Sequence, residues 1–247
     1  MYSGGDMDKV RELQEAVLLL QSHSTLREPA TVAGSTGNMI ARAFPGNRFP
    51  TSCMHEFISP AAGSAAATDA FIGGLLHTFL PPGNFYLWVQ QHNLVFTPAF
   101  TQFGIRPDKL IFVTVRNDRE ALWVMEEGLK CASLTAVIGE VRELGFTESR
   151  RLQLAAEKAG VTGFVHRHCP RTTNVTASVS RWQITPLPSV TEKGFPGLGF
   201  PRWSAQLLKA RNGKPSHWDL EWTPEGFRSG SVPAAQPSVH WRKQQTG

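Results

Sequence analysis

Residues 55–76 contain the side chains whose types and spacing come nearest to a site of known chemistry. This segment reads HEFISPAAGSAAATDAFIGGLL, an apolar run followed by a loop of small residues and a helical pattern. A phosphate-binding loop, GxxxxGK[ST], joins a strand to a helix in the same way. Its backbone amides hold phosphates, its lysine contacts the β- and γ-phosphates, and its hydroxyl binds magnesium. The segment therefore raises the question of whether this chain binds a nucleotide.

The side chains that would contact a nucleotide are missing from this loop. The template places Ser59 and Ser64 at the two glycine positions, and Ala65 and Ala66 at the lysine and hydroxyl positions. The start of the following helix offers only a partial positive charge, worth about 0.3–1 kcal/mol to an exposed anion. We therefore predict a strand-to-helix turn that holds no cofactor, and residual nucleotide binding is the alternative.

Other groups capable of chemistry lack the neighbours that a site needs. His166 and His168 flank Arg167 at the end of an apolar run, as a metal pair or a catalytic base would. No acidic residue follows them before Glu192, so we interpret them as a solvated strand end. Three serines lack the GxSxG elbow of a serine nucleophile: Ser64, Ser149 and Ser180. We predict no catalytic residues and no metal site.

A basic run without a single acidic residue extends over residues 158–191. It carries Lys158, Arg167, Arg171 and Arg181. Lysine and arginine contacts to phosphates release counterions, so the run favours weak, sequence-independent and salt-sensitive binding of DNA. An ordinary solvated basic loop is the alternative.

Alternating apolar and helical stretches predict an α/β fold with a mostly parallel central sheet. The expected buried strands are 85–90, 110–115, 134–141 and 161–167, and the expected helices between them are 118–131 and 147–160. The first of these helices has a core face formed by Ala121, Leu122, Met125 and Leu129, and Trp123 lies on another side. Segments 174–184 and 203–222, the second a hairpin around RNGKP, predict antiparallel strands that extend the sheet.

The N-terminal segment predicts a separate amphipathic helix. Its apolar stripe has 3-4-3 spacing and consists of Val10, Leu13, Val17 and Leu20. This stripe can pack on its own domain or on another protein. We divide the chain into the helix and linker (1–37), the core domain (38–223) and a mobile C-terminal tail (224–247), which is rich in Pro, Ser and Gln.

Composition limits the class of protein. The chain has 247 residues, a net charge of +5 and three cysteines too widely spaced for a zinc site or a disulfide framework. No apolar run reaches the ~18 residues of a membrane span, and no secretory signal is visible at the start. We therefore expect a cytoplasmic protein that does not enter a membrane.

Several segments, in their order and spacing, resemble the RecA-like ATPase core and more closely the ImuA family. They cover most of residues 38–222 and read AFPGNRFPTSCMHEF, PAAGSAAATDAF, RPDKLIFVTVRNDREALWVMEEGLKC, LTAVIGEVRELGFTESRRLQLAAEKAGVTGFVHRH, SRWQITPLPS and PRWSAQLLKARNGKPSHWDLEW. The resemblance implies a RecA-like core preceded by an N-terminal helix.

Carried onto this chain, the resemblance implies that the ATPase chemistry is lost. Gly139 stands where a Walker B aspartate would bind magnesium, and Gln91 stands where a recombinase has its catalytic glutamate. Glutamine cannot take a proton from water as a carboxylate does. Glu140 is adjacent to Gly139, but neighbouring residues on a strand point to opposite faces, so we expect it not to replace the aspartate.

The resemblance implies a non-catalytic adaptor in DNA damage-induced (SOS) mutagenesis and translesion synthesis. Its implied partners are an inactive Y-family-like polymerase homologue and an error-prone replicative-type polymerase. RecA or a second copy of this chain is a further partner that the resemblance allows. Two rival functions remain open at this point, a cell-division inhibitor on the same degenerate scaffold and an active DNA-dependent ATPase.

Overall fold

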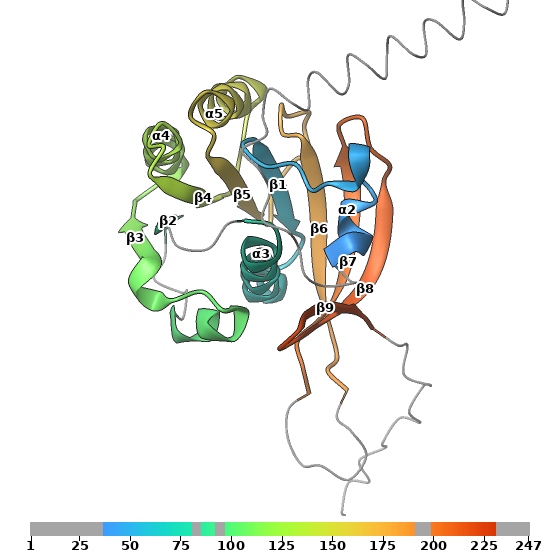
Figure 1. The fold of residues 1–247 in the computed structure, drawn as a ribbon. Helices are drawn as coiled ribbons and strands as arrows, with labels where there is room; N and C mark the ends of the chain where they lie inside the picture. The colour runs from blue at the N-terminus through green and yellow to red at the C-terminus, as the bar shows by residue number, and fades with distance from the viewer. Residues whose placement is uncertain (1–36, 81–84, 92–96, 191–198, 231–247) are drawn as a thin grey trace, which may run out of the picture.

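A computed structural model describes residues 37–80, 85–91, 97–190 and 199–230. Its centre is a nine-stranded sheet with the order β3-β2-β4-β5-β1-β6-β7-β8-β9. The pairings from β3 through to β6 are parallel, and those among β6, β7, β8 and β9 are antiparallel. This confirms the predicted RecA-like α/β class, a mostly parallel sheet extended by antiparallel strands (Figure 1).

The strands follow the apolar runs of the sequence closely. Their bounds are β1 Met54–Ser59, β2 Phe85–Gln90, β3 Leu110–Thr114, β4 Leu134–Val141, β5 Thr162–His168, β6 Ser180–Leu187, β7 Arg202–Ala210, β8 Ser216–Thr223 and β9 Gly226–Ser229. Residues 174–179, which we expected to begin a strand, are irregular instead. The expected hairpin is present as β7 and β8.

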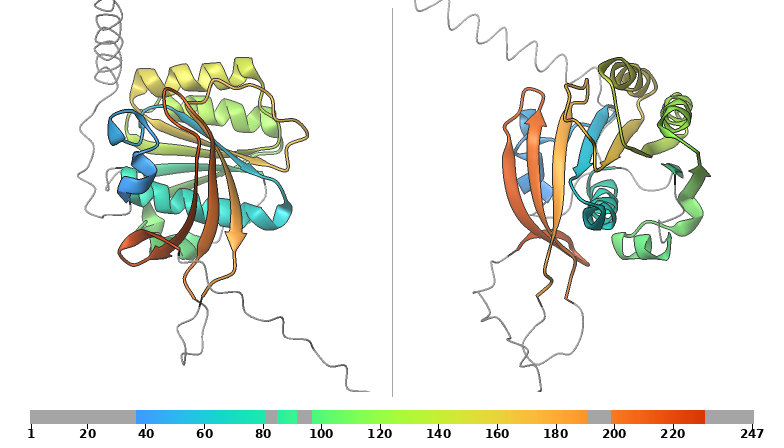
Figure 2. Two further views of the ribbon diagram at one scale, coloured as in Figure 1. Left: turned by 90° about the vertical axis from the view of Figure 1, so that its right-hand side faces the viewer. Right: turned by 180° about the vertical axis from the view of Figure 1, so that it is seen from behind.

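Helices cover both faces of the parallel part of the sheet. Helix α3 (Ala65–Phe79) lies on one face, and α4 (Asp118–Leu129) and α5 (Phe146–Ala159) lie side by side on the other (Figures 1 and 2). The short helix α2 (Gly37–Ala41) lies against the antiparallel strands (Figure 1). Single 3-10 turns follow at Pro45–Asn47, Ala62–Ser64, Thr97–Phe103 and Pro107–Lys109. Helix α5 ends, as predicted, at Gly160, whose φ of 73° favours glycine.

Side chains alternate between the two faces of the sheet along each strand, which produces two hydrophobic clusters, one on each face of the sheet. Phe57, Ile138 and Phe164 pack with α3, whereas Val137 and Val165 pack with α4 and α5. Neighbouring strand residues point to opposite faces. Odd-numbered residues of β1 and even-numbered residues of β4 and β5 therefore face α3.

The core continues beyond the boundary that the sequence suggested. Strand β9 pairs with β8 and buries Phe227, which is 3% exposed, so residues 224–230 belong to the core and not to a tail. Residues 231–247 lie outside the described residues, and so does the predicted N-terminal helix with its stripe Val10, Leu13, Val17 and Leu20. Within the described ranges, none of the helices combines the length and the hydrophobicity that a bilayer span requires.

Candidate functional site

The parallel strands β1, β4 and β5 end at the same edge of the sheet, beside the start of α3. Ser59, Glu140, His166 and His168 stand at these strand ends, all at positions that face α3. Ligands of open α/β sheets bind outside the carboxyl ends of the strands, so this edge is the first place to look for a site. Asp69, in the first turns of α3, lies against the same edge.

Short hydrogen bonds join these side chains, which we call the strand-end cluster: Ser59, Thr68, Asp69, His166 and His168. The Ser59 hydroxyl lies 2.7 Å from the Thr68 hydroxyl and 2.6 Å from Nε2 of His166. Nδ1 of His166 lies 2.7 Å from Oδ1 of Asp69 and 3.0 Å from Nε2 of His168.

The interpretation of the two histidines as a solvated strand end was wrong. His166 is fully buried, because β5 is an internal strand and α3 covers this face. The acidic partner is Asp69, 97 residues earlier in the chain. We looked for a carboxylate only in the sequence after the two histidines, and Asp69 precedes them.

Glu140 lies on the α3 face as well, next to the strand-end cluster. Burial, and after it the negative charge of Asp69, raise the pKa of its carboxyl to about 7, against the opposing effect of a hydrogen bond from the Trp88 indole at 3.1 Å. Neighbouring strand residues do face opposite ways, as expected, but the two residues are exchanged. Glu140 faces α3, and Gly139, which we placed at the magnesium-binding position, points away from it.

The positions aligned with ATPase residues have structural contacts of their own. A Cβ atom on Gly139 would lie 2.1 Å from Sδ of Met125 on α4, so this position has no space for an aspartate. The Gln91 amide donates to Oδ1 of Asp118 at 2.5 Å, and Asp118 also accepts from the backbone N–H groups of Arg142 and Glu143. Gln91 thereby links the end of β2 to the start of α4.

Arg167 is not the exposed DNA ligand that we predicted. Its side chain is fully buried on the α5 face, where it pairs with Glu56 at 2.9 Å and Glu143 at 3.2 Å. Arg181 is 12% exposed and pairs with the other carboxylate oxygen of Glu56 at 2.9 Å. The acid-free run has carboxylate partners from β1 and the loop after β4, which sequence order could not reveal.

The remaining two predicted DNA ligands lie on the surface. Lys158 is exposed in the last turn of α5, and Arg171 is exposed in the loop after β5. The backbone N–H of Arg171 donates to Glu143 at 2.9 Å, which holds this loop against the buried ion pairs. Only these two of the four predicted residues are therefore exposed for contact with a phosphate backbone.

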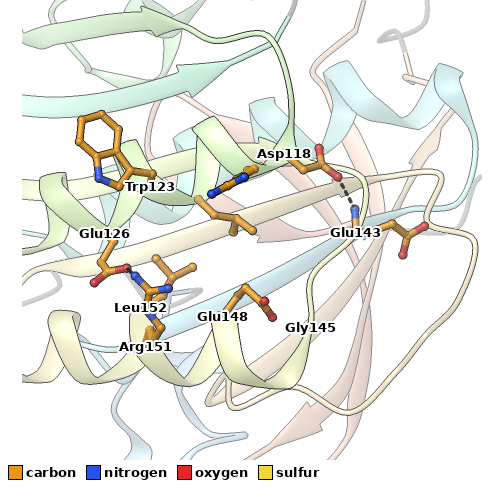
Figure 3. Close-up of a pocket in the computed structure, with 10 residues that line it drawn as sticks. Asp118, Trp123, Glu126, Glu143, Gly145, Glu148, Arg151 and Leu152 are labelled. Atoms are coloured by element: carbon orange, nitrogen blue, oxygen red, sulfur yellow. Dashed lines mark hydrogen bonds and ion pairs between the residues drawn. The ribbon is translucent and has the colours of Figure 1, made fainter.

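A second candidate site is a pocket of about 650 Å³ between α4 and α5. Figure 3 shows the exposed Trp123 at one end of it, with an ion pair between Glu126 and Arg151 across the helices. Trp123, for which the sequence predicted no role, is 63% exposed. The lining includes four carboxylates and two guanidinium groups: Asp118, Glu126, Glu143, Glu148, Arg119 and Arg151.

The fold and the strand-end cluster define a RecA-like α/β protein in which other side chains stand at the nucleotide-contact positions. No family model matches the chain. It is 33% identical over 207 residues to Protein ImuA from Caulobacter vibrioides, in strains NA1000 and CB 15, over 79% of this chain and 85% of each relative. The chain therefore belongs to the ImuA family, which confirms the resemblance.

Proposed function

We propose that this protein is a non-catalytic adaptor in DNA damage-induced mutagenesis and translesion synthesis. Its membership of the ImuA family supports the pathway. The adaptor would bring an inactive Y-family-like polymerase homologue together with an error-prone replicative-type polymerase.

The replacement of the phosphate-contacting lysine and of the aligned magnesium ligands is the observation that supports the non-catalytic role. Ala65 and Ala66 stand at the lysine and hydroxyl positions, and Gly139, aligned with the Walker B aspartate, packs against Met125 on the α4 face. The Gln91 amide donates a hydrogen bond to Asp118. An amide cannot take a proton from water as a carboxylate does. Without these groups, phosphoryl transfer loses both its metal and its positioned nucleophile.

The pocket between α4 and α5 supports the choice of a protein as partner. Large exposed aromatic side chains are enriched at interfaces, and Trp123 lies at the pocket edge beside Leu122 and Leu152. The lining carries two more acidic than basic side chains, on a chain whose net charge is +5. We infer that the pocket takes a basic segment of one polymerase partner.

The test is recovery of partners by the tagged full-length chain from cells treated with a DNA-damaging agent. The parent protein should retain both polymerase proteins, and Trp123→Ala should lose at least one of them. Leu208→Ala, which removes another exposed apolar side chain, on β7, is the matched control and should behave as the parent. Recovery of a cell-division protein instead of the polymerases would replace this proposal with the division-inhibitor function.

Calorimetry with Mg-ATP tests the non-catalytic part separately. We expect no binding tighter than millimolar and no ATP hydrolysis, with or without DNA, because Ala65 and Ala66 occupy the lysine and hydroxyl positions of the loop. A stoichiometric isotherm in the micromolar range would contradict the proposal.

A further inference from the structure

The strand-end cluster contains three metal-binding side chains whose ligand atoms point to one place. One ligand atom each from Asp69, His166 and His168 lies within 4.8 Å of the other two. The three come from α3 and from two alternate residues on the same face of β5. Asp69 and His168 are partly exposed, so the group can be reached from solvent.

One direction of the hydrogen bonds leaves Nδ1 of His166 with the lone pair that a metal ion needs. The Thr68 hydroxyl donates to the carbonyl oxygen of Ser64 at 3.0 Å and accepts from the Ser59 hydroxyl. Ser59 then accepts from Nε2–H of His166. In this tautomer of the neutral imidazole Nδ1 has a free lone pair, whereas in the other tautomer Nδ1–H donates to Asp69.

This lone pair points at two other groups that donate electron pairs to cations. Asp69 Oδ1 lies 2.7 Å from Nδ1, and His168 Nε2 lies 3.0 Å from it. Without a metal ion, the other tautomer joins the two groups by a hydrogen bond from Nδ1–H to Asp69. With a metal ion, the lone pair of Nδ1, the carboxylate of Asp69 and Nε2 of His168 all lie close enough to share it.

We propose that Asp69, His166 and His168 bind a divalent transition-metal ion, with zinc as the best match. Two imidazoles and one carboxylate form a common zinc ligand set that leaves a fourth position open. With metal–ligand bonds of about 2.0–2.2 Å, tetrahedral ligand atoms lie roughly 3.3 Å apart. The 2.7 Å separation between His166 and Asp69 would need to widen by roughly 0.6 Å, and the 3.0 Å separation between His166 and His168 by roughly 0.3 Å.

The neighbouring residues suit this assignment. A metal-bound histidine usually donates its other ring N–H to a fixed acceptor, and Ser59 accepts that hydrogen bond here. The ion would link α3 directly to β5 beside the loop where a phosphate-binding protein holds its nucleotide. Its role would be to hold this edge of the sheet together without any nucleotide.

The experiment is a zinc titration of the EDTA-treated, dialysed full-length chain by calorimetry, with cobalt absorption as a spectroscopic readout. We expect one ion per chain, bound at submicromolar concentration, and the intense visible bands of tetrahedral cobalt. Asp69→Asn and His168→Gln should each weaken binding by more than the roughly 10–100-fold that loss of an outer-shell partner costs. Both residues are partly exposed, so both variants should fold, which circular dichroism will check.

His217→Gln is the matched control. This exposed histidine on β8 also lies beside a carboxylate, with Nε2 3.7 Å from Oδ1 of Asp219, but outside the strand-end cluster. It should bind zinc as the parent does. The proposal is overturned if the parent binds no stoichiometric zinc, if the two cluster variants bind as tightly as the parent, or if a cobalt–thiolate band assigns the ion to a cysteine. In the first case, Nδ1–H of His166 donates a hydrogen bond to Asp69 in place of a metal bond.

Discussion

Replacing Arg167 with methionine should destabilise the fold far more than its place in a basic sequence run suggests. Arg167→Met keeps the length of the side chain and removes its charge and its hydrogen bonds. The guanidinium donates to Glu56, Glu143, Asn174 and the carbonyl oxygen of Thr172 at 2.9–3.2 Å. The contacts with Thr172 and Asn174 fix the loop after β5, and those with Glu56 and Glu143 join β5 to β1 and to the loop after β4.

The magnitude follows from the burial of Glu56. Its side chain is fully buried, and Arg167 and Arg181 each contact one of its oxygens. Removing one partner from a buried ion pair costs about 3–5 kcal/mol, because the remaining charge stays in a medium of low polarity. Arg181 still pairs with Glu56, so we expect a loss near the lower end, roughly 3 kcal/mol of the 5–15 kcal/mol typical of a domain.

Urea unfolding followed by tryptophan fluorescence measures this loss directly. Arg106→Met is the matched control, because Arg106 pairs with Asp108 at a similar distance, 2.8 Å, but its side chain is 73% exposed. Exposed pairs contribute about 0–1 kcal/mol, so the control should unfold near the parent midpoint. Equal losses in the two variants would refute the reasoning. Adding Glu56→Gln to Arg167→Met should cost less than the sum of the single changes, because both single changes remove the same Glu56–Arg167 contact.

Three other predictions concern a buried glycine, a buried histidine and a pair of exposed basic residues. Gly139→Asp should restore no magnesium site and should destabilise the fold by several kcal/mol, since a buried carboxylate would collide with Met125; an unchanged urea midpoint would contradict the packing. Burial lowers the pKa of His55 from 6.5 to about 4, so the unfolded chain binds more protons in that range. Stability should therefore fall by roughly 3 kcal/mol from pH 6.5 to 4, a loss that His55→Gln should abolish. Replacing Lys158 and Arg171 with glutamate should abolish weak binding of single-stranded DNA in fluorescence anisotropy at low salt without lowering the melting temperature; binding equal to the parent's would refute the DNA hypothesis.

The central strands β2, β4 and β5 were predictable from the sequence because they are buried on both faces and appear as continuous apolar runs. The expected segments 85–90 and 134–141 coincide with β2 and β4. Strand β9 was missed because it has only four residues, Gly226–Ser229, and its one large buried side chain is Phe227. Its pairing with β8 across a tight turn, and not its composition, places it in the core.

The contacts of the charged residues were not predictable, because their partners are distant in sequence. Arg167 meets Glu56, which lies 111 residues earlier, and His166 meets Asp69 on another element. A charge run read along the chain suggests a solvated surface. The parallel order of β5 and β1 instead places Arg167 beside Glu56, and the packing of α3 on the other face places Asp69 beside His166.

The strand-end cluster also explains how the fold keeps a polar sheet edge after losing its nucleotide contacts. In a phosphate-binding loop, backbone amides and side chains at this edge obtain partners from the bound phosphate. Here Ser59 lies between Thr68 and His166, and His166 continues the chain of contacts to Asp69. Each buried polar group thus has a protein partner, and an unpaired buried group would cost about 1–3 kcal/mol. These side-chain contacts satisfy the polar groups of this edge without a phosphate, which agrees with the proposed non-catalytic role.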